Sequence, residues 1–352
     1  MQKKRNTMSW SSFSGGDTWA PVRIGLILNP HSRINKGHVW EQEAKVLLGK
    51  ERVCCTRSVD EIPDALAQLL DREAVTLLAI SGGDGTVHHV LNALLTIWRR
   101  QQQETKETLT LPPILLLCGG TLNLVAHSLS IHGTPFALLK QFLETSHRMR
   151  VGELLLHQQR ILRLESERWG VRFGFVFGSS LTARCLELYD DKWGGGYVGL
   201  GRFLFEAIRG FACKTSLWKE VEPYLLPPHS TLTADEHPFS YIAAVASTID
   251  IKILRGLIKG LIVEKPIPGT MRLRLVEDVK VSEVIRRLPE LVLGREAQGI
   301  VDLEGVKSIE LSGDFSLDGE TYMGTTRSQG SYHVEVPMWT VPFVSGRFFS
   351  SM

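Results

Sequence analysis

Cysteine is scarce in this sequence, and its spacing matches no common metal site. Five cysteines occur among 352 residues, and no Cys-x-x-Cys pair is present. An odd number of scattered thiols indicates neither a disulfide framework nor a structural zinc site. The chain is therefore expected to be a reduced, cytoplasmic protein.

Long apolar runs and strong net charge are also lacking. No stretch reaches the roughly 18 consecutive apolar residues that a spanning helix needs, so any membrane contact is expected to be peripheral, on the inner membrane face. The net charge of +2 gives no support for a nucleic-acid partner. Residues 1–20 are polar and serine-rich without an apolar core, and we interpret them as a disordered leader.

The most informative segment is an apolar run that enters a glycine-rich turn. Val75–Ile80 is followed by Ser81-Gly82-Gly83-Asp84-Gly85-Thr86. A continuous apolar run bounded by glycines is typical of a strand buried on both faces. Glycines let backbone amides approach an anion, and the next helix, expected from Val87 to Trp98, points its free N–H groups there. The pattern favours a nucleotide-phosphate site over a plain strand-to-helix corner.

Strands and helices alternate four times in the first 150 residues. Strands are expected at residues 22–28, 52–56, 75–80 and 112–118, and the polar segment 99–108 is expected to be a surface loop. This alternation predicts an α/β fold with a doubly wound, mostly parallel sheet. Ligands bind such sheets beyond the carboxyl ends of the strands, where the loops after Leu28, Ile80 and Leu117 would meet.

The character of the chain changes after about residue 150. Short strand-like segments separated by turns predict a β-rich, sandwich-like second domain with fewer clear helices, at 200–211 and 281–291. The expected organisation is a leader (1–20), an α/β nucleotide-binding domain (21–150), a β-rich domain (151–335) and a tail (336–352) that could return to the first domain.

Two further loops of the first domain carry polar candidates. Asn29 follows the first strand, and Gly120, Thr121 and Asn123 follow the fourth in a second strand–turn–helix unit. The simpler alternatives are an ordinary loop for Asn29 and a helix cap for Thr121. No Gly-Lys-Ser/Thr follows the glycine turn, and no GxGxxG follows the first strand, so neither a P-loop nor a dinucleotide fingerprint is present.

An acidic triplet, Asp318-Gly319-Glu320, lies far downstream. Paired carboxylates in a crevice can raise the pKa of one of them and create a general base near neutral pH. The alternative is a surface turn, which is common for this triplet.

A basic amphipathic segment at 249–264 could lie on anionic lipid, with Lys252, Arg255 and Lys259 among isoleucines and leucines. The alternative is a half-buried helix or strand with a solvated basic face.

Together these motifs resemble the diacylglycerol kinase catalytic family, in its bacterial lipid kinase branch, which is related to sphingosine and ceramide kinases. The matching segments, in the family's order, are Asn29-Pro30 with Ser32 and Gly37, Ser81–Thr86, Gly120–Ala126 and Leu317–Glu320. Each motif alone is common, but the ordered set, over about residues 22–325, is specific.

The resemblance implies an ATP-dependent kinase that uses Mg²⁺ and acts in lipid metabolism on a lipid at a membrane surface. The resemblance does not decide whether the protein forms a homodimer. The implied ATP contacts are Asn29, Thr56, Gly82, Gly83, Asp84, Gly85, Thr86, Gly120, Thr121 and Asn123. Glu320 would accept the proton of the lipid hydroxyl, oriented by Asp318. Asp84 would hold Mg²⁺ or assist as a base, and the resemblance does not decide between these roles.

Three functions follow from this sequence. The first is a kinase that phosphorylates diacylglycerol or a related amphiphile. The second is a lipid- or nucleotide-binding regulatory protein that has lost activity, suggested by Pro268-Gly269, where relatives commonly carry Asp-Gly. The third is an NAD kinase, which shares the glycine turn, but the expected Asn-Glu pair does not follow it here.

Overall fold

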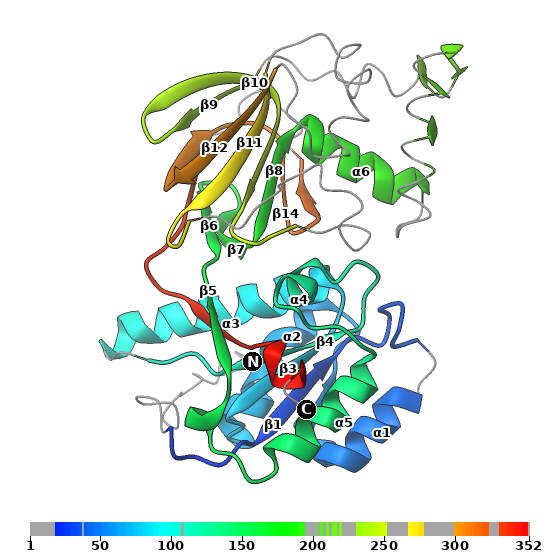
Figure 1. Ribbon diagram of the computed structural model, residues 1–352, viewed down its shortest axis with the longest axis vertical. Coiled ribbons are helices and arrows are strands. Elements are labelled where there is room, and N and C mark those ends of the chain that lie inside the picture. Colours follow the sequence, from blue (N-terminus) through cyan, green and yellow to red (C-terminus); the bar gives the residue numbers. More distant parts are fainter. Residues whose placement is uncertain are drawn as a thin grey trace, which may run out of the picture. The chain divides into compact units, whose positions relative to one another are not determined.

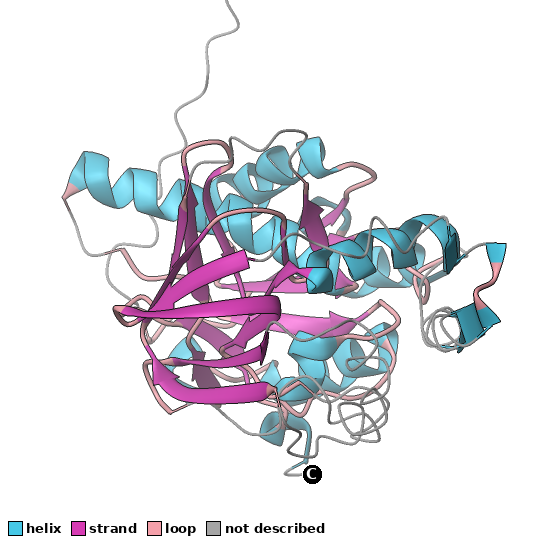
Figure 2. Ribbon diagram, turned by 90° about the horizontal axis from the view of Figure 1, so that it is seen from above, coloured by secondary structure: helices cyan, strands magenta, loops and turns pink. Residues whose placement is uncertain are grey.

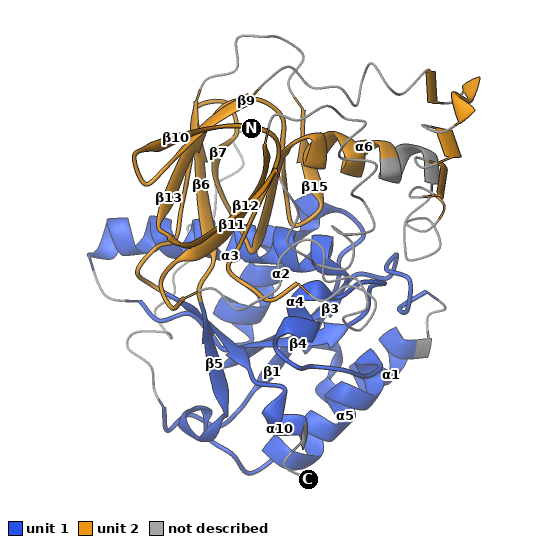
Figure 3. Cartoon of the chain, turned by 45° about the horizontal axis from the view of Figure 1, so that its top comes forward, with its two compact units in different colours: residues 1–159, 340–352 blue, residues 160–339 orange. Residues whose placement is uncertain are grey.

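The fold was analysed in a computed structural model. It describes residues 18–36, 39–106, 109–193, 202, 205–206, 209–210, 213–216, 218–219, 230–251, 267–277, 299–323 and 331–350. The chain forms two compact units, residues 1–159 with 340–352 and residues 160–339 (Figure 3). The change of unit therefore lies at Gln159–Arg160, a few residues later than the boundary expected from sequence.

The first unit is built on a six-stranded sheet. Its strands are β1 (Ile24–Leu28), β2 (Val53–Cys55), β3 (Leu77–Gly82), β4 (Ile114–Cys118), β5 (Leu156–Gln159) and β17 (Val341–Val344). Their order is β2-β1-β3-β4-β17-β5, and every pair is parallel except β17 with β5. All residues of β1, β3 and β4 are buried, as apolar runs in a doubly covered sheet require. The predicted mostly parallel α/β sheet is confirmed.

Helices cover the sheet in two groups. The helices of this unit are α1 (Val39–Leu48), α2 (Ile62–Ala67), α3 (Asp84–Thr105), α4 (Leu124–Ser128), α5 (Pro135–Ser146) and α10 (Arg347–Ser350). Helix α1 lies beside α5, where Trp40 meets Phe136 edge-on at 5.8 Å, and α10 also packs on α5 (Figure 1). Helix α2 packs with α3. Each group buries an apolar stripe, which is why the strands between them carry few polar residues.

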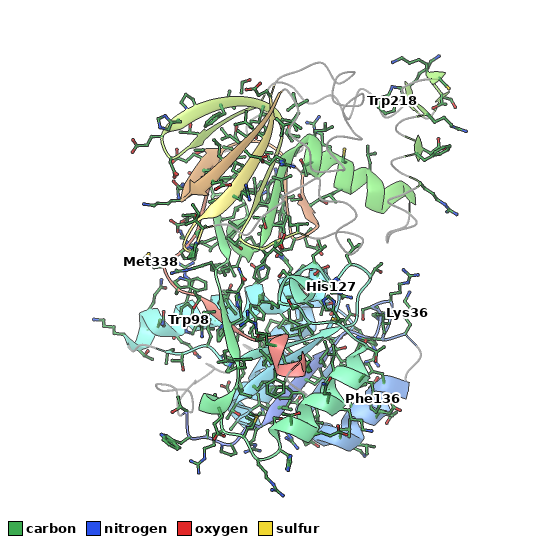
Figure 4. All side chains as sticks on the ribbon, viewed as in Figure 1. Lys36, Trp98, His127, Phe136, Trp218 and Met338 are labelled. Carbon is green, nitrogen blue, oxygen red and sulfur yellow. The ribbon has the colours of Figure 1, made fainter. Side chains whose placement is uncertain are left out.

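Helix α3 is longer than its apolar pattern predicts. The segment 99–108 was expected to be a loop, but the helix continues to Thr105. Arginine, glutamine and glutamate have high helix propensity, so a polar run can remain helical. The end is also anchored, because the indole N–H of Trp98 (labelled in Figure 4) donates to the Leu109 carbonyl at 2.8 Å.

The C-terminal segment belongs to the sheet of the first unit. Strand β17 inserts between β4 and β5, with Phe343 opposite Ile114 and Val341 opposite Gln159. A methyl group on Gly346 would lie 2.2 Å from the Ser130 carbonyl oxygen, so the chain after β17 is in close backbone contact with the loop after α4.

The second unit is β-rich and antiparallel, as predicted (Figure 2). Its strands are β6 (Leu162–Ser166), β7 (Gly170–Gly174), β8 (Val176–Ser180), β9 (Ser230–Ala234), β10 (His237–Ser247), β11 (Met271–Glu277), β12 (Ile300–Val306), β13 (Ser308–Leu311), β14 (Phe315–Leu317), β15 (Glu320–Tyr322) and β16 (Tyr332–Glu335). Among the described residues of this unit, helix α6 (Leu181–Trp193) packs on β8, β10, β14 and β15.

These strands join into one sheet that folds over its own core. The main path runs β15-β14-β8-β10-β9-β13-β16-β6-β7, with β11 and β12 branching from β10. A single apolar cluster takes side chains from most of the strands, including Leu164, Phe177, Tyr241, Leu273 and Phe315. Strands that share one core must face each other across it, which is the sandwich-like arrangement expected from sequence.

The two ends of this path meet. Trp169, before β7, contacts Tyr322 of β15 edge-on with ring centroids 5.4 Å apart. The contact follows from a bend in the chain, because β7 and β8 are separated only by Phe175 and occupy distant positions in the path. At the bend, the Phe175 carbonyl accepts a hydrogen bond from the Thr248 amide at 3.0 Å.

Several expected features lie outside the described residues. These are residues 1–17 of the leader, Gly37, the helix at 281–291, parts of the helix at 200–211, and 252–264 of the basic segment. Ile249 and Ile251, which begin that segment, are buried in the second unit. None of the described helices combines the length and apolarity needed to cross a membrane.

We predict that Phe343→Ala destabilises the protein by about 3–5 kcal/mol, because a fully buried ring is lost from β17. Urea unfolding followed by circular dichroism measures the change. Val46→Ala, at an 85% exposed site on α1 of the same unit, is the control and should change stability by less than about 0.5 kcal/mol. Equal effects of the two substitutions would contradict a structural role for β17.

Candidate functional site

Three loops meet at the carboxyl edge of the first unit's sheet, as predicted. The Asn29 amide donates to the Ser81 carbonyl at 2.9 Å, and the Gly119 amide donates to the Gly82 carbonyl at 3.0 Å. The Ile34 amide donates to the Gly119 carbonyl, also at 3.0 Å. The loops after β1, β3 and β4 are therefore joined by backbone hydrogen bonds.

Two glycine pairs allow this contact. A methyl group on Gly120 would lie 2.3 Å from the Gly83 Cα, and one on Gly119 would lie 2.8 Å from the Gly82 nitrogen. Both distances are too short for a side chain, so the turns touch backbone to backbone. The sequence predicted glycines here so that an anion could approach the backbone. The structure gives a further reason, because the two turns touch each other at these glycines.

Two helices start at this contact. Helix α3 begins at Asp84 after Gly83, and no side chain caps its first turn. Helix α4 begins after Asn123, which has a left-handed φ of 49°. The Asn123 side chain instead binds Gly120, accepting from its amide at 2.9 Å and donating to its carbonyl at 3.1 Å. Asn123, and not Thr121, is therefore the residue that precedes α4. The uncapped start of α3 offers N–H groups and a positive dipole end to an anion.

The Asp84 carboxylate links the two helices. Its Oδ1 accepts a hydrogen bond from the Val125 amide in the first turn of α4, at 3.2 Å. It thus supplies the cap that α4 otherwise lacks. Burial, and next the charge of Asp84, raises the pKa of the Cys118 thiol to about 12. Cys118 is therefore an inert packing residue beneath the site.

Asn29 and Thr86 couple the first loop to α3. The Asn29 Nδ2 donates to the Thr86 Oγ1 at 2.9 Å, and its Oδ1 accepts from the His31 amide at 2.9 Å. Sequence reasoning missed Asn35, whose buried Nδ2 donates to the carbonyls of Asn29 and Ser81. Asn35 lies in a polar loop with no distinguishing pattern, so no local signal could have identified it.

Thr56 lies at the same edge but in a different environment. Its amide donates to the Leu28 carbonyl at 2.9 Å, which places it beside the start of the Asn29 loop. Its side chain lines a groove of about 510 Å³ between β2 and α2, together with Cys55, Glu61, Asp64 and Gln68. The groove is polar and is separate from the glycine contact itself.

The acidic triplet of the second unit forms a tight hairpin between β14 and β15. Leu317 pairs with Glu320, and both intervening residues have positive φ, 54° at Asp318 and 94° at Gly319. These angles are those of a type I′ turn, for which Asp-Gly is a preferred sequence. The triplet is therefore a turn, as its simpler interpretation expected.

The Asp318 carboxylate also holds the bend between β7 and β8. Its Oδ1 accepts from the Phe175 amide at 2.8 Å and the Val176 amide at 2.9 Å, and its own amide donates to the Val176 carbonyl at 2.8 Å. A methyl group on Gly174 would lie 2.7 Å from its Oδ2. Asp318 thus attaches the acidic turn to the chain segment that closes the sheet.

Glu320 begins β15 and is half-buried. Two residues later, Tyr322 stacks on Phe315 with ring centroids 4.7 Å apart. Burial raises the pKa of the Tyr322 hydroxyl, the positive charge of Arg172 opposes this, and the negative charge of Glu320 adds to it. Arg172 on β7 also hydrogen-bonds this hydroxyl, and it is a second residue that sequence reasoning missed.

A magnesium ion fits Asp84 only as part of a larger ligand set. One carboxylate oxygen is bound to the Val125 amide, and the described residues contain no group of three or more His, Cys, Asp or Glu side chains that could hold a metal. Mg²⁺ is commonly held by one or two carboxylates together with substrate phosphates and water. The site therefore suits a metal–nucleotide complex and not an ion bound by protein alone.

Comparison with known protein families gives a match within the first unit. A family model described as the diacylglycerol kinase catalytic domain matches residues 23–154, which contain all three loops. Residues 23–154 therefore resemble the catalytic domain of that family. No curated protein sequence matches the chain.

The likeness to solved structures covers both units. A diacylglycerol kinase from Bacillus anthracis str. Sterne is 12% identical, with a TM-score of 0.56, and the match covers 92% of this chain and 96% of that chain. Another chain from the same organism, assigned to the same class, is 15% identical, with a TM-score of 0.58 over 92% and 97% of the two chains. At such identities the likeness shows the fold.

We predict that Gly120→Ala disrupts the first unit more than Gly83→Ala does. The added methyl meets backbone at 2.3 Å in the first variant and at 3.3 Å in the second. We expect a loss of roughly 1–3 kcal/mol for Gly120→Ala. We also expect its affinity for a fluorescent ATP analogue to weaken by more than about tenfold. Gly83→Ala should retain most of both, and the reverse order would contradict the backbone contact.

Proposed function

We propose that this protein is an ATP-dependent lipid kinase, which transfers the γ-phosphate to a hydroxyl of diacylglycerol or a related amphiphile. The observation that carries the proposal is the contact of Gly82 and Gly83 with Gly119 and Gly120, directly below the uncapped start of α3. Bare backbone and free N–H groups at a strand edge suit the phosphates of a nucleotide. The family of residues 23–154 supplies the reaction class.

In this proposal the first unit binds ATP. The amides of Gly83, Gly85 and Thr86 face the phosphates, and the turn with Gly120, Thr121 and Asn123 forms the other side of the phosphate site. Asn29 supports this arrangement through Thr86. Thr56 and its groove would receive the nucleoside end, because a polar groove beside the phosphate edge can accept a ribose or a base.

Asp84 would contribute its Oδ2 to Mg²⁺, since its Oδ1 is bound to Val125. The ion, when bound with ATP, supplies positive charge that neutralises the phosphate oxygens. The same hydrogen bond makes Asp84 a poorer candidate for the base, because it fixes the carboxylate at the start of two helices.

Glu320 would be the general base. It would take the proton of the lipid hydroxyl as that oxygen bonds to the γ-phosphorus and the bond to the β-phosphate oxygen breaks, releasing ADP. Asp318 would orient it, because both of its backbone-bound contacts fix the turn from which Glu320 extends. Positioning and charge would supply most of the rate enhancement.

The test is a radiolabelled ATP assay on a total lipid extract, followed by identification of the labelled product. We expect a labelled lipid with wild type and a decrease of roughly 10²–10⁴-fold in turnover for Glu320→Gln. Asp84→Asn should also lose turnover. The control is Glu310→Gln, an exposed carboxylate of the same unit, which should remain active.

Different results would change the proposal in different ways. Full activity of Glu320→Gln would remove the base assignment. Absence of any labelled lipid, with ATP binding retained, would favour the regulatory protein that binds nucleotide without turnover. Labelling of NAD in place of lipid would indicate an NAD kinase.

The lipid is proposed to be reached at a membrane surface through the basic segment 249–264. Ile249 and Ile251 are buried, so the contact would come from later residues of the segment. Three cations among apolar residues attract anionic lipid by roughly 1 kcal/mol each.

We predict that replacing Lys252, Arg255 and Lys259 by glutamate reduces flotation with anionic liposomes. Neutral liposomes and a triple replacement of exposed cations elsewhere, Arg57, Lys106 and Lys140, serve as controls. Unchanged flotation of the segment variant would exclude this contact.

A further inference from the structure

The chain of β15 places Glu320 and Tyr322 on one face of the second unit's sheet. Residues two apart on a strand share a face. Their paired residues across the hairpin are Leu317 and Phe315, both buried in the core of this unit. Glu320 and Tyr322 therefore lie on the core-facing side of β15, with Glu320 at its open end beside the turn.

Arg172 lies on the core-facing side of β7. It is directly opposite Leu164, a fully buried core residue, whereas its neighbour Phe173 is opposite Arg163. Strands β7 and β15 are the two ends of the sheet path, and the Trp169–Tyr322 contact brings them together. An inward-facing arginine is thus located at the closure of the sheet, on the same side as Glu320.

Tyr322 connects the two charged groups. Arg172 hydrogen-bonds its hydroxyl, and the charges of Arg172 and Glu320 both act on that hydroxyl with opposite sign. The ring itself is fixed by Phe315 and Trp169. A half-buried carboxylate beside an apolar core is costly unless a cation or hydrogen-bond donors are close to it. In the proposal below, Arg172 would supply the cation and Tyr322 would connect it to the carboxylate.

We propose that Arg172 is a positioning residue for Glu320, holding its carboxylate ionised and directed along the inner face of β15 through a guanidinium–tyrosine pair. This role rests on the proposed function, in which Glu320 is the base. Arg172 does not need to touch the substrate, because its effect is exerted through the charge and orientation of Glu320.

The other charged groups around β15 have separate partners. Asp318 is bound to the Phe175 and Val176 amides. On α6, which packs on β15, Arg184 donates to Asp314 at 3.0 Å, and Glu187 is the remaining charged side chain among its described residues. Strand β14 carries no charge. Arg168 lies over the Trp169 ring, 4.8 Å from the ring centroid. Arg172 is the cation whose hydrogen bond and charge act on the Tyr322 hydroxyl.

The decisive measurement is the titration of the Glu320 carboxyl by NMR of protein labelled with ¹³C at the glutamate carboxyl. The Glu320 signal is assigned by its absence in Glu320→Gln. In Arg172→Met its midpoint should move to higher pH by about one unit or more, because a nearby guanidinium favours the charged carboxylate. Arg172→Lys should restore most of the shift. An unchanged midpoint in Arg172→Met would overturn the proposal.

The control is Arg163→Met on the neighbouring strand β6. Arg163 lies on the opposite face and is paired with Glu335 at 2.6 Å. The Arg163→Met substitution removes an ion pair of the same unit, so it measures the effect of general destabilisation. In this variant the titration midpoint of Glu320 should not move. A shift of equal size in Arg163→Met would reduce the role of Arg172 to a structural one.

Activity provides a second, separate result. Where wild type phosphorylates a lipid, Arg172→Met should lower kcat by at least about tenfold with little change in the KM for ATP. The acidic limb of its pH–rate profile should move to higher pH with the NMR midpoint. Tyr322→Phe should give a smaller shift of the same sign. If no lipid is phosphorylated by any form while the midpoint still depends on Arg172, the proposed function fails and the Arg172–Glu320 coupling stands.

Discussion

The first unit depends on a contact that only glycine permits. Gly82 and Gly83 of one strand–turn–helix unit touch Gly119 and Gly120 of the next, and every other feature of the edge is arranged around that contact. It fixes the relative positions of the starts of α3 and α4. The Asp84 carboxylate then accepts from the Val125 amide and so joins the two strand–turn–helix units, while the Asn123 side chain binds Gly120 within its own turn. The proposed anion site would be preorganised, because its N–H groups are oriented before a ligand arrives.

The second unit uses a charged side chain for a comparable purpose. Asp318 receives two amide hydrogen bonds at the bend between β7 and β8, where the sheet must turn to close. Hydrogen bonds to a charged group are stronger than those between neutral groups. A single carboxylate can therefore hold the bend by binding two amides that the bend leaves without a partner in the sheet. The same turn presents Glu320. Closure of the fold and placement of the candidate base are therefore linked by one residue.

Local patterns were sufficient for the main elements and for the three loops that meet at the sheet edge. The apolar run before Gly82, the alternation of strands and helices, and the Asp-Gly pair at 318–319 all carry their structural meaning within a few residues. The end of α3 was missed because polarity was taken as evidence for a loop. Asn35, Arg172 and Tyr322 were missed for another reason. Asn35 binds Ser81, 46 residues away, and Arg172 meets Tyr322 only because the two ends of the sheet path come together.

The return of the chain through β17 has a consequence for how the protein is made. The second unit leaves the first after Gln159 and rejoins it before Val341, and these two residues are paired across β5 and β17. During synthesis, β4 and β5 emerge long before the strand that separates them in the sheet. The first unit thus cannot complete its sheet until the whole inserted unit has left the ribosome. Until then, the edge of β4 offers unpaired backbone groups to other chains. Early folding of the inserted unit would shorten the time during which this edge is exposed, but it would not remove the exposure.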